Sequence, residues 1–144
     1  EAGRQVRPEG IGAMGLSLGG EMTLMLSALE MRVHAACVCG YLTSHRSTFL
    51  ATPHCTCGHL RGLGRHFEHV DLAALIAPRP LFVDSGRADP SFPWQDAVQV
   101  VEELRPVYRL FERPPEWLGI EVHGGAHEIS GKQSIPWMLE RLAG

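Results

Sequence analysis

The chain has 144 residues, of which 44% are hydrophobic and 20% are charged, and its formal net charge is −3. This length predicts a single domain, and the composition excludes a disordered or strongly basic chain, so we expect no nucleic-acid partner. No apolar run approaches the ~20 residues that cross a bilayer, so we expect no membrane partner and a cytoplasmic protein. Because the sequence begins at Glu1 rather than Met, we interpret it as a processed product or an excerpt.

Strand-like and helix-like segments alternate along the chain, which predicts a parallel sheet covered by helices. We predict strands at 11–14, 33–39, 81–83 and 118–122, and helices at 18–30 and 71–76, from 94 onward and from 134 onward. Residues 40–70 are irregular and rich in Gly, His, Arg and Cys. A connection of that length is usually functional, so we predict a loop or lid-like insertion there.

The predicted helices carry apolar residues at helical spacing. In the first helix these residues share one side, and in the last we expect them to be buried: Leu18, Met22, Met25, Leu26 and Leu29 in the first, Ile135, Met138, Leu139 and Leu142 in the last. Pro106 predicts a kink or break near Arg105 in the long helix. Ser134 and Pro136 form a suitable cap and first-turn pair for the last helix.

Gly15-Leu16-Ser17-Leu18-Gly19 is a G-x-S-x-G stretch that lies between a predicted strand and a predicted helix. In that context the motif predicts a nucleophile elbow, a tight turn that raises the serine hydroxyl at the carboxyl edge of a sheet. We expect glycine to be needed at both Gly15 and Gly19, because side chains there would collide with the turn. A glycine-rich turn without chemistry is the alternative, since so short a motif also occurs by chance.

Candidate partners follow in the order acid and then histidine, which is the order of α/β-type serine hydrolases. Asp84 and Asp89 follow the predicted strand at 81–83, and His123 and His127 follow the strand at 118–122. We choose Asp89, which lies deeper in its turn, and His127, which follows two glycines, over Asp84 and His123. Functional groups in open α/β sheets gather at the carboxyl edge, so three separate loops are expected to meet there.

The chemistry assigns a role to each residue. Ser17 is the candidate nucleophile, and His127 is the base that takes its proton and returns it to the leaving group. Asp89 orients the His127 ring and stabilises its charged form. The backbone N–H of Leu18, the residue after the nucleophile, is the expected oxyanion-hole donor.

The four cysteines form two C-x-C pairs, Cys37 with Cys39 and Cys55 with Cys57. His54 and His59 flank the second pair, which suggests a metal cluster. A single intervening residue is unusual for structural zinc, however, and cysteines two apart on a strand are commonly packed side chains. We therefore predict no metal and no cofactor.

With these motifs the chain resembles the α/β-hydrolase superfamily, and most of all its acetyl xylan esterase and dienelactone-hydrolase-like esterase branch. The matching stretches are 11–20, 71–80 with Ala77-Pro78-Arg79-Pro80, 85–90 and 124–128. The resemblance implies a Ser17–His127–Asp89 triad acting on a small acyl ester through an acyl-enzyme. Dienelactone hydrolases proper use a cysteine nucleophile, so Ser17 argues against that activity.

The resemblance also implies that about four strands and a second oxyanion donor precede the elbow strand. We therefore interpret residues 1–144 as the carboxyl-terminal part of a single α/β-hydrolase domain, that is, a partial fold with the elbow near the amino terminus. The elbow strand is then an apolar edge, which predicts self-association. The alternatives are an inactive half-domain that acts only through a partner, a peptidase or thioesterase with the same triad, and a metal module at residues 54–59 with Cys37 and Cys39.

Overall fold

The computed structural model describes residues 10–51, 54, 58 and 61–143. Its sheet contains four strands in the order β1-β2-β3-β4, and all three pairings are parallel. The strands are β1 (Gly12–Leu16), β2 (Ala35–Cys39), β3 (Leu81–Gly86) and β4 (Leu118–His123). The prediction of about four mostly parallel strands is confirmed, and every carboxyl strand end lies at one edge of the sheet.

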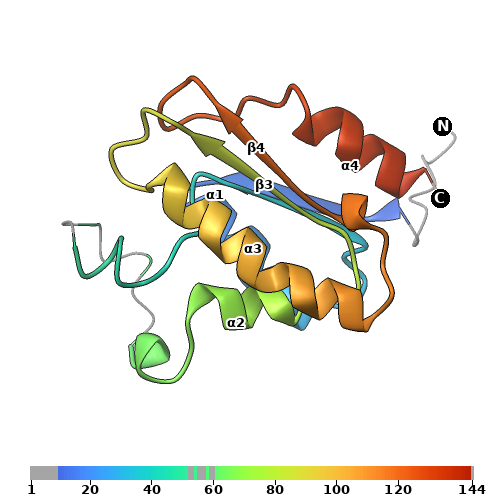
Figure 1. Ribbon diagram of the computed structural model, residues 1–144, viewed down its shortest axis with the longest axis horizontal. Coiled ribbons are helices and arrows are strands. Elements are labelled where there is room, and N and C mark those ends of the chain that lie inside the picture. Colours follow the sequence, from blue (N-terminus) through green and yellow to red (C-terminus); the bar gives the residue numbers. More distant parts are fainter. Residues whose placement is uncertain (1–9, 52–53, 55–57, 59–60, 144) are drawn as a thin grey trace, which may run out of the picture.

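Helices cover both faces of the sheet (Figure 1). The helices are α1 (Leu18–Leu29), α2 (His69–Ala74), α3 (Trp94–Leu110) and α4 (Ser134–Leu142), with 3-10 turns η3 (Leu63–Arg65) and η4 (Pro115–Trp117). The first three pack on one face, and α4 packs on the other against β2 and β3. None of the helices in the described ranges is long and apolar enough to cross a membrane.

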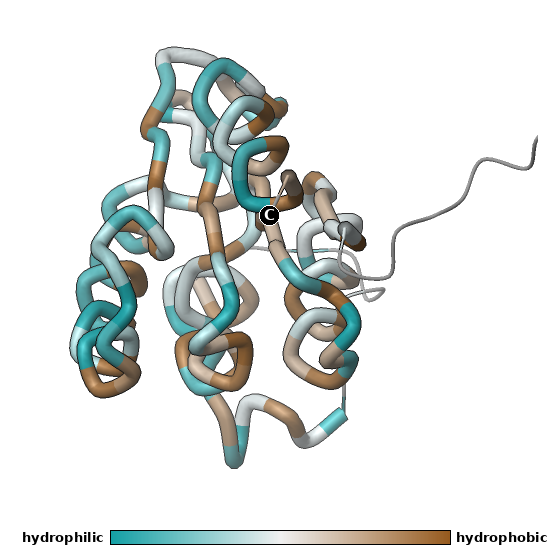
Figure 2. Tube along the Cα trace, turned by 90° about the vertical axis from the view of Figure 1, so that its right-hand side faces the viewer, coloured by the Kyte–Doolittle hydropathy of each residue, from teal (hydrophilic) through white to brown (hydrophobic). Residues whose placement is uncertain are grey.

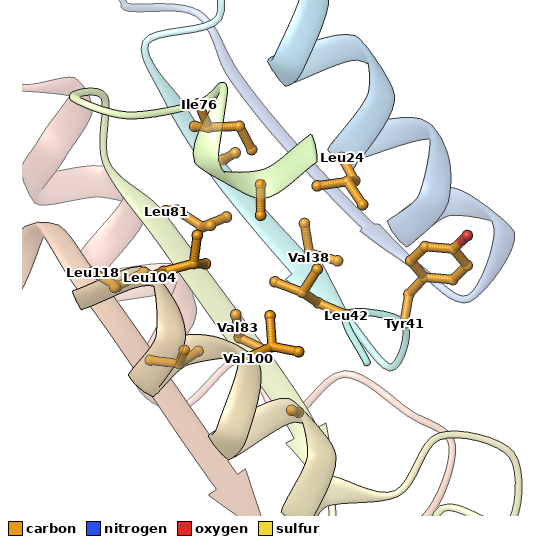
Figure 3. Close-up of a cluster of buried hydrophobic side chains, with 14 of the residues drawn as sticks. Leu24, Val38, Tyr41, Leu42, Ile76, Leu81, Val83, Val100, Leu104 and Leu118 are labelled. Carbon is orange, nitrogen blue, oxygen red and sulfur yellow. The ribbon is translucent and has the colours of Figure 1, made fainter. Parts of the chain in front are cut away.

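The main hydrophobic core lies between the sheet and α1, α2 and α3 (Figure 3). Val38 and Val83 contribute from the two central strands, Leu24 from α1 and Leu104 from α3, and all four are at most 1% exposed. β2 is buried along its whole length, as expected for a central parallel strand covered on both faces. This core fixes the strand ends from which the loops of the candidate site extend.

A smaller cluster lies under α4 and contains Cys37, Cys39, Phe82 and Met138. The Sγ atoms of the two cysteines are 3.6 Å apart and fully buried. The hydrogen bond to Cys39, together with burial, raises the pKa of the Cys37 thiol. Such thiols behave as small packed groups, since reactivity needs an accessible thiolate.

The outer side of α1 differs from that of a typical surface helix. Its apolar stripe of Leu18, Met22, Leu26 and Leu29 is exposed by 44 to 80%, whereas the inner side buries Leu24 together with smaller or polar residues. Thr23 fits the inner side because its hydroxyl donates to the carbonyl of Gly19, at 2.8 Å. In Figure 2 apolar stretches alternate with hydrophilic ones along the helices.

Three expectations about the later helices are wrong. The break expected near Arg105 does not occur, and α3 continues past Pro106 to Leu110, because Pro106 lies on the exposed side, where water can bond the freed carbonyl. The kink, the other outcome expected of Pro106, stays a prediction. In α4 only Met138 of the expected apolar set is buried, and Ile135 and Leu139 are exposed by 48% and 63%. Ser134 is not the cap of α4.

Candidate active site

Ser17 occupies the turn between β1 and α1 with φ 58° and ψ −120°. Residues other than glycine rarely adopt a positive φ, and holding one there costs on the order of 1–3 kcal/mol. Two backbone hydrogen bonds hold this conformation, from Ser17 N–H to the carbonyl of Cys39 at 3.0 Å and from Glu21 N–H to the carbonyl of Ser17 at 2.9 Å. The turn therefore has the backbone strain expected of a nucleophile elbow.

The two motif glycines differ in what they allow. A Cβ added at Gly15 would lie 2.2 Å from the carbonyl oxygen of Gly19, so a side chain there cannot fit without moving the turn. A Cβ at Gly19 would meet nothing within 4 Å, so the expectation that both positions require glycine is wrong for Gly19. Gly20 is the second tight position, since its Cβ would lie 2.8 Å from the carbonyl oxygen of Cys39.

Asp89 and His127 come together from the loops after β3 and β4. The Nδ1 atom of His127 lies 2.7 Å from Oδ2 of Asp89, whose side chain is only 1% exposed. The N–H groups of Ser91 and Phe92 donate to the other oxygen, Oδ1, at 2.8 and 3.1 Å. A carboxylate only accepts, so Nδ1 donates and Nε2 is left to accept a proton.

Backbone contacts lock these two loops against each other. The N–H of Ala88 donates to the carbonyl of Gly125 at 3.0 Å, and the N–H of Arg87 donates to that of His123 at 2.9 Å. A Cβ at Gly86 would lie 2.0 Å from the carbonyl oxygen of Ala126, so only glycine permits this approach. The positions of the Asp89 and His127 loops are thus set by main-chain atoms.

The alternative pair, Asp84 and His123, lies close together, and Asp84 bonds to Ser134, the first residue of α4. Asp84 is fully buried, and its Oδ2 accepts from the Ser134 hydroxyl at 3.0 Å and from Gly131 N–H at 3.2 Å. His123 Nε2 lies 3.1 Å from Asp84 Oδ1, but the angles are not those of a hydrogen bond. His123 Nδ1 accepts from Gly125 N–H at 3.1 Å, which shapes the turn before His127.

A small pocket of about 40 Å³ opens at the Ser17 turn. Its lining combines the start of α1 with aromatic and imidazole rings: Ser17, Leu18, Glu21, Tyr41, Phe49, His54, Gly58 and Phe92. Phe92 stacks on the His127 ring with centroids 5.6 Å apart and planes 16° apart, so the pocket and the Asp89–His127 pair are neighbours. Among the described residues, no hydrogen bond joins Ser17 to His127. Hydrogen bonds between a nucleophile and its base are often long or poorly aligned in the absence of substrate.

The N–H of Leu18 is available for an oxyanion. Leu18 is the first residue of α1, and the first four N–H groups of a helix have no partner within it. The partial positive charge of the helix amino terminus acts in the same direction. Sequence reasoning missed Glu21, a buried carboxylate that lines the pocket one helical turn after Ser17; that spacing is the signal that could have found it.

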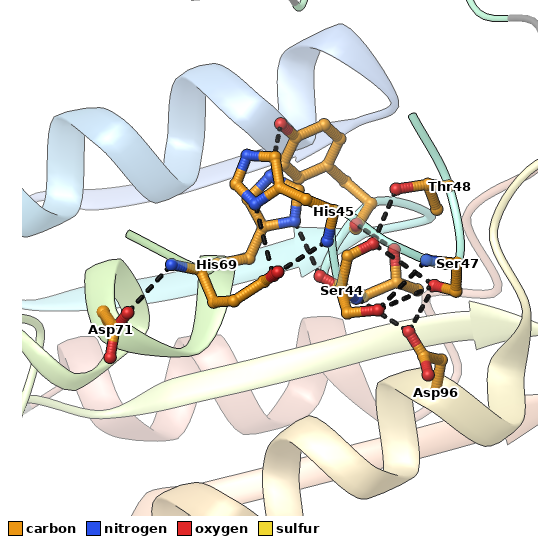
Figure 4. A network of polar contacts seen from close by, with 10 residues as sticks. Ser44, His45, Ser47, Thr48, His69, Asp71 and Asp96 are labelled. Atoms are coloured by element: carbon orange, nitrogen blue, oxygen red, sulfur yellow. Dashed lines mark hydrogen bonds and ion pairs between the residues drawn. The ribbon is translucent and has the colours of Figure 1, made fainter. Parts of the chain in front are cut away.

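A buried polar network supports the pocket from the segment after β2 (Figure 4). His69 is fully buried, with Nδ1 2.6 Å from the carbonyl of Thr43 and Nε2 3.1 Å from the hydroxyl of Tyr41. Burial lowers the pKa of His69 to about 4, so this imidazole stays neutral. Burial, reinforced by the charge of Glu21, raises the pKa of Tyr41.

The proposed metal cluster finds no support in the described ranges, where no three His, Cys, Asp or Glu side chains could hold an ion together. Cys55, Cys57 and His59 lie outside those ranges. Phe92 lines the Ser17 pocket, whereas the Trp94 ring lies under the Arg87 guanidinium at 4.6 Å.

Solved structures of esterases share this architecture. The chain is similar to a glucuronoyl esterase from Solibacter usitatus (TM-score 0.77, 18% identity) and to the glucuronoyl esterase catalytic domain from Hypocrea jecorina (0.74, 20%). It is also similar to Methylesterase BT1017 (0.70, 23%). The chain has a partial α/β-hydrolase fold. The resemblance to the α/β-hydrolase superfamily is thereby confirmed at the level of the fold.

These matches cover almost all of the chain but only part of each relative. They span 96%, 96% and 99% of the chain and 44%, 46% and 31% of the three structures, in the order given. In sequence, the chain is 32% identical over 107 residues to the Putative hydrolase YtaP from Bacillus subtilis, across 72% of the chain and 36% of that protein. No family model matches the chain.

Proposed function

We propose that the chain carries the catalytic triad of a serine esterase that hydrolyses small acyl esters. The observation that carries this proposal is the 2.7 Å contact between His127 and the buried carboxylate of Asp89, beside the strained turn of Ser17. The α/β-hydrolase fold and the esterase names of the similar structures support it. The small volume of the Ser17 pocket favours a short acyl group such as acetyl.

In this mechanism the Ser17 hydroxyl attacks the acyl carbon while His127 Nε2 takes its proton. The Leu18 N–H stabilises the oxyanion of the tetrahedral intermediate, a contribution of roughly 3 kcal/mol for one such donor. His127 returns the proton to the alkoxide, which leaves as the alcohol. Water then attacks the acyl-enzyme by the same route and releases the acid and free Ser17.

A fluorophosphonate probe tests the nucleophile, because it reacts covalently with an activated serine. We expect labelling of the wild-type chain and none after Ser17→Ala. Ser91→Ala is the matched control: it removes another hydroxyl near the site but keeps the backbone N–H that holds Asp89. Labelling that persists in Ser17→Ala would contradict the assignment of Ser17 as the nucleophile. Loss of labelling in His127→Ala would support the role of His127 as the general base.

The second candidate function is that of a half-domain that works by association. β1 pairs only with β2 in the described sheet, and α1, which carries the exposed apolar stripe, packs against β1 and β2. Such an edge is a template for further strands, and the chain spans less than half of the esterase structures named above. Sedimentation of the wild type and of Leu26→Glu tests this. A wild-type chain that stays monomeric at high concentration would count against it.

A further inference from the structure

A second and larger pocket adjoins the one at Ser17. Its volume is about 290 Å³, and its lining combines one aromatic ring with glycines and basic side chains: His45, Phe49, Leu50, Gly58, Arg61, Gly62, Gly64 and Arg65. Phe49 and Gly58 line both pockets. The two pockets are therefore neighbours.

The larger pocket is lined by two basic side chains. Arg61 and Arg65 line it, and among the described residues of the lining none is a carboxylate; the carboxylate of Glu21 lies beside Gly58, which lines both pockets. Neither arginine forms an ion pair with any residue that the structure describes. The nearby carboxylate of Glu68 is already engaged by His45, whose backbone N–H and Nδ1 lie 2.8 and 3.2 Å from it. The two guanidinium groups thus retain their capacity to bind an anion.

Both walls of this pocket pack against buried residues. Gly62, at φ 86°, begins the short turn η3, and Leu63 packs that turn against the main core between the two arginines. On the other wall the His45 ring lies against buried His69, with centroids 3.9 Å apart and planes tilted by 31° (Figure 4). Walls fixed in this way reduce the entropy lost when a ligand is bound.

We propose that Arg61 and Arg65 bind a carboxylate on the alcohol portion of the ester, while the short acyl group occupies the Ser17 pocket. The substrate class is thus an acylated, acidic alcohol. The acyl group is assigned to the Ser17 pocket because that cavity is far smaller, and the alcohol to the larger, basic one. This assignment rests on the proposed esterase function.

Matched esters test the proposal by catalysis. At pH 7.5, 4-acetoxybenzoate carries a carboxylate, whereas 4-acetoxybenzamide has nearly the same shape and no charge. We expect kcat/KM for the acid to exceed that for the amide by about tenfold at low salt, and high salt to reduce the ratio. Arg61→Gln/Arg65→Gln should bring the ratio near one, while Arg109→Gln, at an exposed position of α3, should leave the ratio unchanged. An acid-to-amide ratio that the double variant does not change overturns the proposal. Mono-methyl terephthalate carries its carboxylate on the acyl portion of the ester, so a preference for this compound over its amide also overturns the proposal.

Binding separates this proposal from the esterase function. Calorimetric titration of the Ser17→Ala chain with 4-hydroxybenzoate and 4-hydroxybenzamide needs no turnover. Tighter binding of the acid by about tenfold, lost in the double arginine variant while its circular dichroism is unchanged, supports the anion pocket. Equal binding of the two compounds overturns it. Ester hydrolysis that survives Ser17→Ala would refute the esterase function alone.

Discussion

Replacing Asp89 by Asn tests the triad through hydrogen-bond polarity. Oδ1 of Asp89 accepts two backbone N–H groups, so an Asn at this position must keep its carbonyl oxygen there. The amide NH2 then points at Nδ1 of His127, where Oδ2 now lies at 2.7 Å. Because an NH2 only donates, Nδ1 must become the acceptor and the ring proton moves to Nε2. The nitrogen required to take the proton of Ser17 is then already protonated.

The expected loss follows from that tautomer change. Such a substitution in a serine triad lowers kcat by about 10⁴-fold, which corresponds to about 5 kcal/mol of transition-state stabilisation. Two charge-assisted hydrogen bonds also become neutral ones, which should lower the free energy of unfolding by roughly 1–2 kcal/mol. Activity is therefore expected to fall far more than stability.

The assay is hydrolysis of 4-nitrophenyl acetate, with urea unfolding measured on the same samples. Asp84→Asn is the matched control, because Asp84 is equally buried but bonds to Ser134 and Gly131 instead. We expect that variant to lose stability but to keep its activity per folded molecule within a few fold. An Asp89→Asn chain that retains a third of wild-type activity would refute the reasoning, and so would a folded Asp84→Asn chain as inactive as Asp89→Asn.

Three further predictions concern stability. Gly15→Ala should prevent the elbow from closing and abolish probe labelling, whereas Gly19→Ala should fold and label normally, because only the first Cβ meets backbone. Arg79→Gln should cost about 2–4 kcal/mol in urea unfolding, since Arg79 donates to the carbonyls of Ser27, Glu30 and Val33 at 2.6 to 3.0 Å. Arg32→Gln, which breaks only an exposed ion pair, should leave the urea unfolding curve nearly unchanged. The pKa of His69 is about 4 in the folded chain, below the value of about 6.5 in the unfolded chain. Between these two pH values the unfolded chain binds more protons than the folded one, so the free energy of unfolding falls as the pH drops from about 6.5 towards 4. Between pH 7.5 and 5 the wild type should lose about 2 kcal/mol from this group, and His69→Gln should lose correspondingly less.

The strand and helix order could be predicted because each element has a local signal. Alternating apolar runs and glycine-rich turns mark β1 to β4 and the helices between them, and the order of Ser17, Asp89 and His127 indicates three loops at one edge. The choice of Asp89 over Asp84 remains a prediction about catalysis. The structure pairs Asp89 with His127 and uses Asp84 to bind Ser134.

The remaining features depend on contacts that spacing does not encode. The apolar stripe of α1 is exposed because the helix meets the sheet along its other side, where Leu24 enters the core and Gly20 lies against Cys39 and Tyr41. Periodicity finds an apolar face but does not say which neighbour covers it. The pocket with Arg61 and Arg65 depends on contacts such as those of His45 with Glu68 and His69, and no periodic pattern in the segment after β2 records them.

Main-chain hydrogen bonds at the rim of the sheet link the ends of all four strands. Ser17 N–H bonds to Cys39, Gly40 N–H bonds to Asp84 at 2.8 Å, and Arg87 N–H bonds to His123. These backbone hydrogen bonds set the spacing between the strand ends, and this spacing does not depend on side-chain identity. The distance from nucleophile to base can therefore stay constant while the surrounding loops change sequence, so an evolving chain could alter what it recognises without losing the spacing of its reactive groups.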